Sequence, residues 1–290
     1  MVYYAADDYG LNRLSSARIL QCMEEGALNK VSVFPNFEEI DFEALRRKKA
    51  VRFSLHLNLV EGFCMADPQK VDLLAERDGR LRHTFGGLFR LAVFRPKELE
   101  EQAYGEIKAQ VLHYKSILPE DAAFCIDGHQ HTHMIPPIFK AMMRVLREEA
   151  PDAAYLRIPA EPITPYLACP SLYGTYRPVN LVKQWLLKVL WGINQREWKK
   201  FPVPTAYFFG ILLSGQMDEK RVKKILPHYL RLAEKKGRDL EVLFHPGYLQ
   251  REETDFEAKN IPFAEFYHSP HRRAEYEAVQ SLGGTDHAVY

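Results

Sequence analysis

Residues 2–36 read "VYYAADDYGLNRLSSARILQCMEEGALNKVSVFPN", and they contain one complete strand–helix–strand pattern. The apolar run at 2–7 predicts a buried strand, and apolar side chains at helical spacing predict a helix over 15–30 with Ser15 as its N-cap. A second apolar run at 30–36 predicts the next strand. Two strands joined through a helix run parallel, so this stretch predicts a parallel sheet with helical crossovers.

The same alternation continues to the end of the chain. Further strands are predicted at 51–60, 122–127, 153–159, 205–210 and 240–247. Helices are predicted at 40–50, 97–118, 136–150, 179–198, 218–237 and 269–282, with a break in the fifth near Pro227. About seven strands, each followed by a helix or an excursion, favour an α/β fold of the TIM-like barrel kind, closed or nearly closed and open to distortion. The absence of a glycine fingerprint after any strand disfavours an open dinucleotide-binding sheet.

The domain organisation is predicted to be simple. No linker or internal repeat interrupts the pattern, so residues 1–290 are expected to form a single domain. Two segments, 61–96 and 159–179, show turn signals in place of periodicity. We expect both to be insertions on the rim of the barrel. By analogy with other barrel enzymes a homodimer is one option, although the sequence shows no interface.

Composition and charge exclude several classes of protein. The 290 residues are 47% hydrophobic and carry a formal net charge of +1, so neither nucleic acid nor an anionic membrane surface is expected as the main partner. The longest apolar stretch, 185–193, is interrupted by Lys188 and is too short to span a bilayer. The four cysteines lack metal-site or disulfide spacing, and the N-terminus lacks a signal-peptide pattern. We therefore expect a cytoplasmic protein.

Ionisable residues gather at the ends of five predicted strands. In parallel β/α folds the active site lies at the carboxyl ends of the strands, so these side chains are expected to meet on one rim. The candidates are Asp7, Asp8, His56, Asn58, Asp127, His129, His131, His133, Arg157 and His245.

Two patterns place the histidines. The strand at 51–60 alternates strictly, which puts His56 and Asn58 on its polar side. The segment "DGHQHTH" at 127–133 holds three histidines at a spacing of two. If this segment is extended, all three side chains lie on one side of it. A surface loop is the alternative for the histidine cluster, and solvent exposure is the alternative for His56.

Carboxylates and imidazoles together form a ligand set for a metal ion. The mixed oxygen and nitrogen donors suit Zn²⁺ and other divalent first-row metals. Two histidines and one carboxylate leave coordination positions open for water and substrate. The adjacent pair Asp7 and Asp8 then divides into one metal ligand and one residue that takes a proton from water activated by the metal. The chemistry alone leaves open which aspartate has which role.

Six motifs resemble those of the YdjC-like carbohydrate deacetylases, a family that includes chitooligosaccharide deacetylases and hopanoid-biosynthesis-associated deacetylase-like proteins. They occur in order along nearly the whole chain: "ADDYGLN" at 6–12, "LHLNLVEG" at 55–62, "IDGHQHTHMIPPIF" at 126–139, "LRIP" at 156–159, "EVLFHPGY" at 241–248 and "SPHRRAEYEAV" at 269–279. The resemblance is specific for the family and much less so for the substrate.

The resemblance implies a β/α barrel that binds one divalent metal ion. The motifs match Asp8, His56 and His129 to the metal ligands, Asp7 to the catalytic base and His245 to a general acid. The remaining candidates are expected to contact the substrate or to support the ligands: Arg157, Asn58, Asp127 and His131. The resemblance does not decide between Zn²⁺ and Mg²⁺.

The implied activity is metal-dependent removal of an acetyl group from an N-acetylated sugar, either an oligosaccharide or a glycolipid. Two positions depart from the family pattern: Tyr9 stands where phenylalanine is usual, and Gln130 replaces the middle histidine of a triplet. One alternative is hydrolysis of another bond such as a phosphoester, although Arg157 is the one basic candidate on the rim. A second alternative is a sugar-binding protein that retains the site without catalysis.

Overall fold

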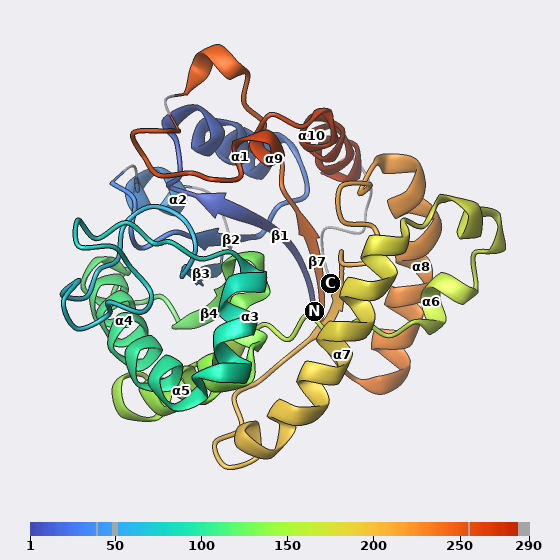
Figure 1. The fold of residues 1–290 in the computed structure, drawn as a ribbon. Helices are drawn as coiled ribbons and strands as arrows, with labels where there is room; N and C mark the ends of the chain where they lie inside the picture. Colours follow the sequence, from blue (N-terminus) through green and yellow to red (C-terminus); the bar gives the residue numbers. More distant parts are fainter. Residues whose placement is uncertain (39, 48–51, 255, 284–290) are drawn as a thin grey trace.

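A parallel sheet forms the centre of the computed structural model, which describes residues 1–38, 40–47, 52–254 and 256–283 (Figure 1). In this described part, seven strands pair in the order β5-β4-β3-β2-β1-β7-β6. Their bounds are β1 Val2–Tyr9, β2 Lys30–Val33, β3 Arg52–Leu57, β4 Cys125–Gly128, β5 Tyr155–Leu156, β6 Tyr207–Phe209 and β7 Leu240–Phe244. The predicted strand residue Val51 and the predicted helical residues 48–50 lie outside the described ranges.

The sheet curls into an open half-barrel of parallel strands, the distorted form of the barrel that the strand–helix alternation predicts. All pairings between neighbouring strands are parallel. The two edge strands are β5 and β6, and the backbone N–H of Leu156 in β5 donates to the carbonyl of Pro204, just before β6, at 2.9 Å. This bond connects the two edges of the sheet, so the carboxyl ends of the strands surround a common centre.

Helices and short turns connect the strands and cover the outside of the sheet (Figure 1). The α-helices are α1 Arg13–Glu25, α2 Phe42–Arg46, α3 Phe85–Phe94, α4 Pro96–Ile117, α5 Pro136–Glu149, α6 Thr164–Leu167, α7 Pro178–Trp198, α8 Glu219–Lys236, α9 Ala264–Tyr267 and α10 Pro270–Gly283. The 3-10 turns are η1 His129–Met134, η2 Pro170–Thr175 and η3 Arg251–Glu253. Helix α3 lies inside the segment 61–96, where no helix is predicted from the sequence. Within the described ranges, no helix combines the length and apolar character that crossing a bilayer requires.

Two local predictions about helices were wrong. The N-cap of α1 is Asn12 in place of Ser15, because Asn12 Oδ1 accepts hydrogen bonds from the backbone N–H groups of Leu14 at 2.8 Å and Ser15 at 3.4 Å. Helix α8 continues through Pro227 without a break. A proline removes one helical hydrogen bond, and Pro227 lies on the exposed face while the opposite face of α8 is buried. Packing of that face therefore keeps the helix continuous.

Candidate functional site

The aspartate pair at the end of β1 lies on an irregular stretch of backbone. Between Ala6 and Tyr9 the register of β1 against β2 shifts, and Asp8 has a φ of 71°. In a regular strand, adjacent side chains point to opposite faces. Here both carboxylates approach the same ring nitrogen: Asp7 Oδ2 lies 3.8 Å and Asp8 Oδ1 lies 3.5 Å from His56 Nε2. The irregularity therefore gathers the two charges at one place.

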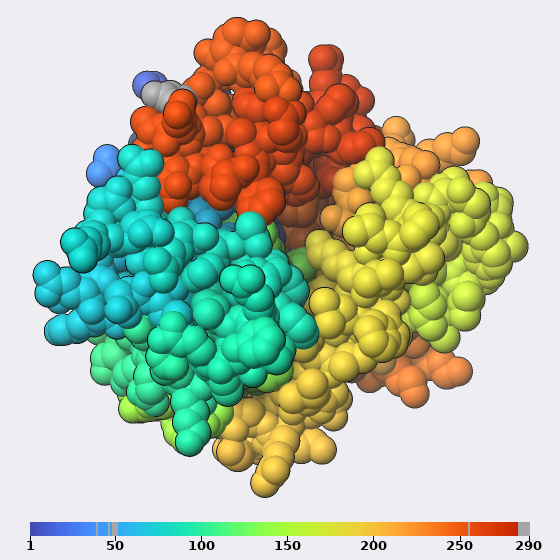
Figure 2. Space-filling model, viewed as in Figure 1, coloured from blue at the N-terminus to red at the C-terminus, as the bar shows by residue number. Residues whose placement is uncertain are grey.

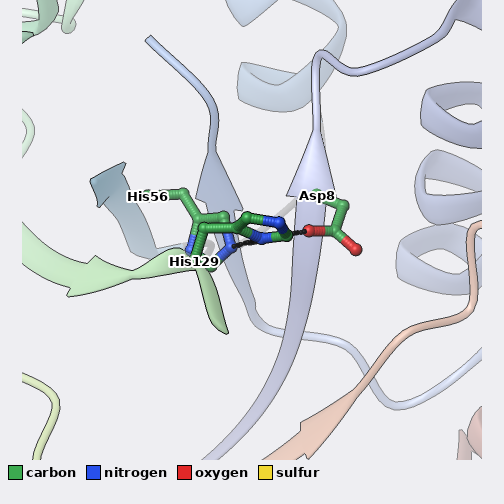
Figure 3. Close-up of side chains that lie close together, drawn as sticks. All are labelled: Asp8, His56 and His129. Carbon is green, nitrogen blue, oxygen red and sulfur yellow. Dashed lines mark hydrogen bonds and ion pairs between the residues drawn. The ribbon is translucent and has the colours of Figure 1, made fainter. Parts of the chain in front are cut away.

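Asp8, His56 and His129 bring three potential ligand atoms together (Figure 3). Asp8 Oδ1 lies 3.2 Å from His129 Nδ1 and 3.5 Å from His56 Nε2, and the two nitrogens are 3.2 Å apart. Ligands bonded to a metal at about 2.1 Å stand roughly 3.0 to 3.4 Å from one another in octahedral or tetrahedral arrangements. This triangle therefore has the dimensions of one face of a metal site.

Each of the two histidines also faces a buried carboxylate with its other ring nitrogen. His56 Nδ1 lies 2.6 Å from Asp127 Oδ1, and His129 Nε2 lies 3.2 Å from Glu61 Oε2. Metal-binding histidines usually contact a carboxylate or carbonyl in this way, which fixes the tautomer and the orientation of the ring. Sequence reasoning assigned no role to Glu61, although the residue stands in the quoted motif "LHLNLVEG". The hydroxyl of Tyr267 donates to Glu61 Oε2 at 2.6 Å.

The carboxylates around the triad outnumber the lysine and arginine side chains that neutralise them. The connected buried side chains that the structure describes include five carboxylates and three permanent cations: Asp7, Asp8, Glu61, Asp127 and Glu241 against Lys30, Arg157 and Arg272. Two negative charges remain. A buried excess of this size requires compensation, and one divalent cation or two protonated histidines supply it.

The pKa values of the ligand candidates reflect this negative environment. Burial by itself lowers the pKa of His56, but the carboxylates of Asp7, Asp127 and Asp8 outweigh burial and raise it to about 10. Burial opposes ionisation of Asp8, yet Arg272 and the two histidine rings hold its pKa well below the usual range. The surroundings that attract a proton to His56 attract a metal cation equally, so proton and metal compete for the same place.

A second group of potential ligands, Asp7, His56 and Asp127, shares the same ring but is already satisfied. Both oxygens of Asp7 accept hydrogen bonds from Arg157 at 2.8 Å, and Asp127 Oδ2 accepts one from the hydroxyl of Ser32 at 2.7 Å. Asp8 Oδ1, in contrast, is buried without a hydrogen-bond partner among the described residues. The donor set with Asp8 therefore fits a cation better than the set with Asp7.

Arg157 lies beside Asp7, as the strand-end rule predicts, and its guanidinium is bound to buried carboxylates. Besides its two bonds to Asp7, its Nε donates to Glu241 Oε1 at 2.8 Å, and the side chain is completely buried. Burial raises and the Arg157 and His56 charges lower the pKa of Asp7, and the net effect is a lowered pKa. These contacts favour the second of its expected roles, orienting the site through Asp7, over contact with the substrate.

Asn58 is buried and contacts the triad only indirectly, through the turn that carries Glu61. Its amide donates to the Glu61 carbonyl at 2.7 Å, and its Oδ1 accepts from the backbone N–H groups of Val60 and Glu61 at 3.1 Å. These bonds shape the turn that brings the Glu61 carboxylate to His129. Tyr9, which departs from the family pattern, donates its hydroxyl to the Asp41 carbonyl at 3.1 Å, away from the ligand atoms.

The histidine segment is not extended, so the prediction that its three rings share one side was wrong. Residues His129–Met134 form the turn η1, in which Gln130 and His131 have positive φ values. The turn separates the rings: His129 faces Asp8, whereas His133 Nε2 lies 3.0 Å from the Arg157 carbonyl and donates to it. His131 borders a cavity, and burial lowers its pKa well below the usual value, so the ring is neutral.

The turn η1 packs the His133 ring against Gly128, and this packing leaves no room for a side chain at residue 128. A Cβ at Gly128 would lie 2.9 Å from Cγ of the buried His133 ring. We expect Gly128→Ala to lower the free energy of unfolding by about 1–3 kcal/mol, which thermal denaturation would measure. Gly192→Ala is the matched control, because an added Cβ there has no neighbour within 4 Å among the described residues. Equal melting temperatures for the two variants would contradict the prediction that a side chain at residue 128 clashes with His133.

His129 of the ligand group lines a cavity of about 480 Å³. Its polar lining includes Asp7, His129, His131, Lys183 and His245, and apolar side chains from α3, α7 and the C-terminal segments complete it. Figure 2 shows the hollow between these segments. His245 follows β7, and its Nδ1 lies 3.3 Å from Glu275 Oε2. The cavity therefore has buried charged residues at one end and is large enough to hold a small molecule.

Comparisons with known proteins agree with this architecture. A family model described as YdjC-like protein matches residues 2–283. A carbohydrate deacetylase of Danio rerio is 27% identical over 157 residues, which are 54% of this chain and 49% of that protein. The carbohydrate deacetylase of Homo sapiens is 28% identical over 158 residues, 54% of this chain and 47% of its own length. The chain thus matches about half the length of these curated relatives.

One solved structure resembles the whole fold. It is the crystal structure of a candidate cellobiose-phosphate cleavage protein from Enterococcus faecalis V583, with a TM-score of 0.61 and 17% sequence identity. The likeness covers 97% of this chain and 94% of that one. At this identity the likeness shows a common fold.

Proposed function

Because the chain belongs to the YdjC-like family, we propose that it is a carbohydrate deacetylase that removes an acetyl group from an N-acetylated sugar with the help of one divalent metal ion. The naming of its curated relatives supports the activity. The observation that carries the proposal is the triad Asp8, His56 and His129. Its three donor atoms lie 3.2–3.5 Å apart, and one of them, Asp8 Oδ1, is buried without a hydrogen-bond partner among the described residues.

A divalent metal ion bound by this triad would supply Lewis-acid activation of the acetyl carbonyl and of water. The residues around it divide the remaining work. We assign Asp7 to accept the proton of the attacking water, because Asp7 borders the cavity and lies next to the triad. Arg157 holds both oxygens of Asp7 and keeps them ionised, so the base is oriented and ready to accept a proton.

We assign His245 to protonate the leaving nitrogen. The ring lines the same cavity as Asp7 and His129, and the carboxylate of Glu275 contacts its Nδ1 atom. In the proposed reaction a C–O bond forms as water attacks the acetyl carbon, and the C–N bond breaks. The proton taken by Asp7 and the proton given by His245 balance, so the products are acetate and a free amino sugar.

Hydrolysis of a phosphoester has less support in this site. Arg157, the basic residue expected on the rim, is occupied by Asp7 and Glu241 and has no donor directed at the cavity in the described structure. Lys183 does line the cavity, and burial lowers its pKa, which weakens it as a permanent cation. A phosphoryl group is usually bound by several fixed cations or backbone amides.

The proposal is tested by acetate release. The purified protein is stripped with a chelator and then reloaded with Zn²⁺, Mg²⁺, Mn²⁺ or Co²⁺ before incubation with N-acetylglucosamine, its oligomers and acetylated glycolipids. We expect acetate only from metal-loaded protein. Phosphate release from sugar phosphates is measured in parallel. Phosphate without acetate, or tight metal binding without turnover of any acetylated sugar, would overturn the proposal.

Glu61 is expected to strengthen metal binding through His129. Replacing Glu61 with glutamine removes the charge that faces His129 Nε2 while preserving the size of the side chain. We expect the metal dissociation constant to rise about 10- to 100-fold, measured by titration against a chromogenic chelator. Glu106→Gln is the matched control, since Glu106 is equally buried but accepts hydrogen bonds from the backbone of Met65 and Ala66. A shift of the same size in the control would contradict the role of Glu61.

A further inference from the structure

Two apolar helices flank the opening of the cavity. Phe85 of α3 lines it from one side, and Val179, Val182 and Leu186 of α7 line it from the other. In Figure 2 the segment that contains α3 and the segment that contains α7 border the central hollow. Both helices therefore present their outer surfaces on the face through which the cavity opens.

Helix α7 exposes an unusual number of large apolar side chains. Val182 is 63% exposed, Trp185 64% and Ile193 56%. Together with Val179 and Val189 they recur every three or four residues, so they form one continuous stripe along the helix. Isolated exposed apolar residues are normal, but a continuous stripe marks an interaction surface.

Helix α3 adds to the same surface. Nearly all of its ten residues are apolar or glycine, yet Leu88 is its one buried side chain in the described structure. Phe94 is 76% exposed and Val93 is 62% exposed. The partly buried side chains of Phe85, Phe89, Leu91 and Ala92 also pack against the core, so Val93 and Phe94 at the C-terminal end of α3 are the apolar side chains left to solvent.

Basic residues accompany the apolar ones. Within α3 and α7 the charged residues are Arg90, Lys183, Lys188, Arg196 and Glu197. Glu197 is paired with Lys200 at 2.6 Å, whereas Arg90, Lys188 and Arg196 are exposed. The overall charge of +1 therefore conceals a locally basic face. An exposed tryptophan, aliphatic side chains and lysine or arginine on one helix are typical of helices that lie in a membrane interface.

We propose that the face formed by α3 and α7 docks on an anionic lipid bilayer. The stripe on α7, the exposed end of α3 and the exposed basic residues of the two helices match the apolar and negatively charged layers of such a surface. Docking in this orientation places the opening of the cavity at the lipid headgroups. This proposal concerns where the protein works and stands apart from the deacetylation proposed above.

Vesicle binding tests the proposal with the full chain. Flotation is compared for vesicles of phosphatidylcholine alone and of phosphatidylcholine mixed with phosphatidylglycerol, at low and high salt. We expect roughly 10²-fold tighter binding to the mixed vesicles at low salt, and a loss of this preference at high salt. Tryptophan emission should shift to shorter wavelength on binding. Trp191 and Trp198 pack against each other, so the shift reports Trp185.

Substitutions test whether vesicle binding depends on this face or on any exposed apolar side chain of the protein. The double variant Trp185→Glu with Ile193→Glu is expected to bind mixed vesicles at least about 10-fold more weakly. Neither side chain lines the cavity, so acetate release from a soluble substrate should remain unchanged. The matched control converts two exposed leucines of α1 and α4, Leu14→Glu with Leu112→Glu, and should bind like the unaltered protein.

Three outcomes would overturn the proposal. The first is absence of binding to mixed vesicles at low salt, and the second is equal binding by the two double variants. The third is a dimer, seen by light scattering, that the Trp185 and Ile193 substitutions dissociate, because the face would then join two copies of the chain. Loss of acetate release alone bears on the proposed activity, whereas vesicle binding is measured without substrate, so the two proposals fail separately.

Discussion

Asp7→Asn is expected to lower kcat for acetate release by about 10²–10⁴-fold while metal binding is retained. Asparagine has nearly the shape of aspartate but cannot accept a proton from water at neutral pH. The three donor atoms of the triad belong to Asp8, His56 and His129, so the metal ligands remain. The measurements are steady-state kinetics on the metal-loaded variant and elemental analysis of the same sample. Near-normal turnover would show that Asp7 is not the base.

A control is needed because Asp7 also pairs with Arg157. Asp7→Asn removes one of the negative charges around that buried guanidinium, and this loss could disturb the site indirectly. Glu241→Gln removes another carboxylate from the same guanidinium, and Glu241 does not line the cavity. We expect Glu241→Gln to lower stability but to keep most of kcat. Equal losses of kcat in both variants would assign the effect to Arg157 and its partners.

His129→Ala is expected to weaken metal binding by at least roughly 10²-fold. Four-ligand structural zinc sites bind with about 10–16 kcal/mol, or about 3 kcal/mol for each ligand. Removing the imidazole also leaves Glu61 facing an empty space, which places a further uncompensated charge next to Asp8. Metal content after dialysis and the dissociation constant from competition with a chelator measure the effect.

Excess metal distinguishes the two catalytic variants. Activity of His129→Ala should recover in part when metal is added, because the defect lies in metal occupancy, whereas Asp7→Asn should not recover. His131→Ala is the matched control, since His131 belongs to the same turn and is buried but contributes no atom to the triad. It should retain metal. Loss of metal from His131→Ala but not from His129→Ala would overturn the ligand assignment.

Much of the architecture could be predicted because its signals are local. The alternation of apolar runs with amphipathic segments predicts the parallel sheet, and all seven described strands overlap segments predicted as strands. The rule that active sites lie at strand ends then selects ten candidate residues, and the family motifs match three of them, Asp8, His56 and His129, to metal ligands. These three side chains do lie together. Their roles as ligands remain a prediction for the metal-binding experiments.

Other features depend on contacts between segments that are distant in sequence. Glu61 reaches His129 across 68 positions, and Arg272 pairs with Asp8 from the opposite end of the chain. No periodicity encodes such pairs, because each is created by the curl of the sheet. The histidine segment was mispredicted for a related reason. Its spacing suits an extended chain, but the turn η1 is held by buried contacts such as that of His133 with the Arg157 carbonyl.

The sequence by itself determined the succession of strands and helices along the chain, the family motifs and the residue types at the strand ends, since all of these are properties of short segments. The family motifs assign different roles to Asp7 and Asp8, but only the tertiary structure gives the two carboxylates different surroundings. The shifted register of β1 turns both carboxylates toward His56, after which Arg157 satisfies Asp7 and leaves Asp8 Oδ1 without a partner among the described residues. Which carboxylate is free for a cation depends on which buried guanidinium reaches it, and that is settled by packing in three dimensions.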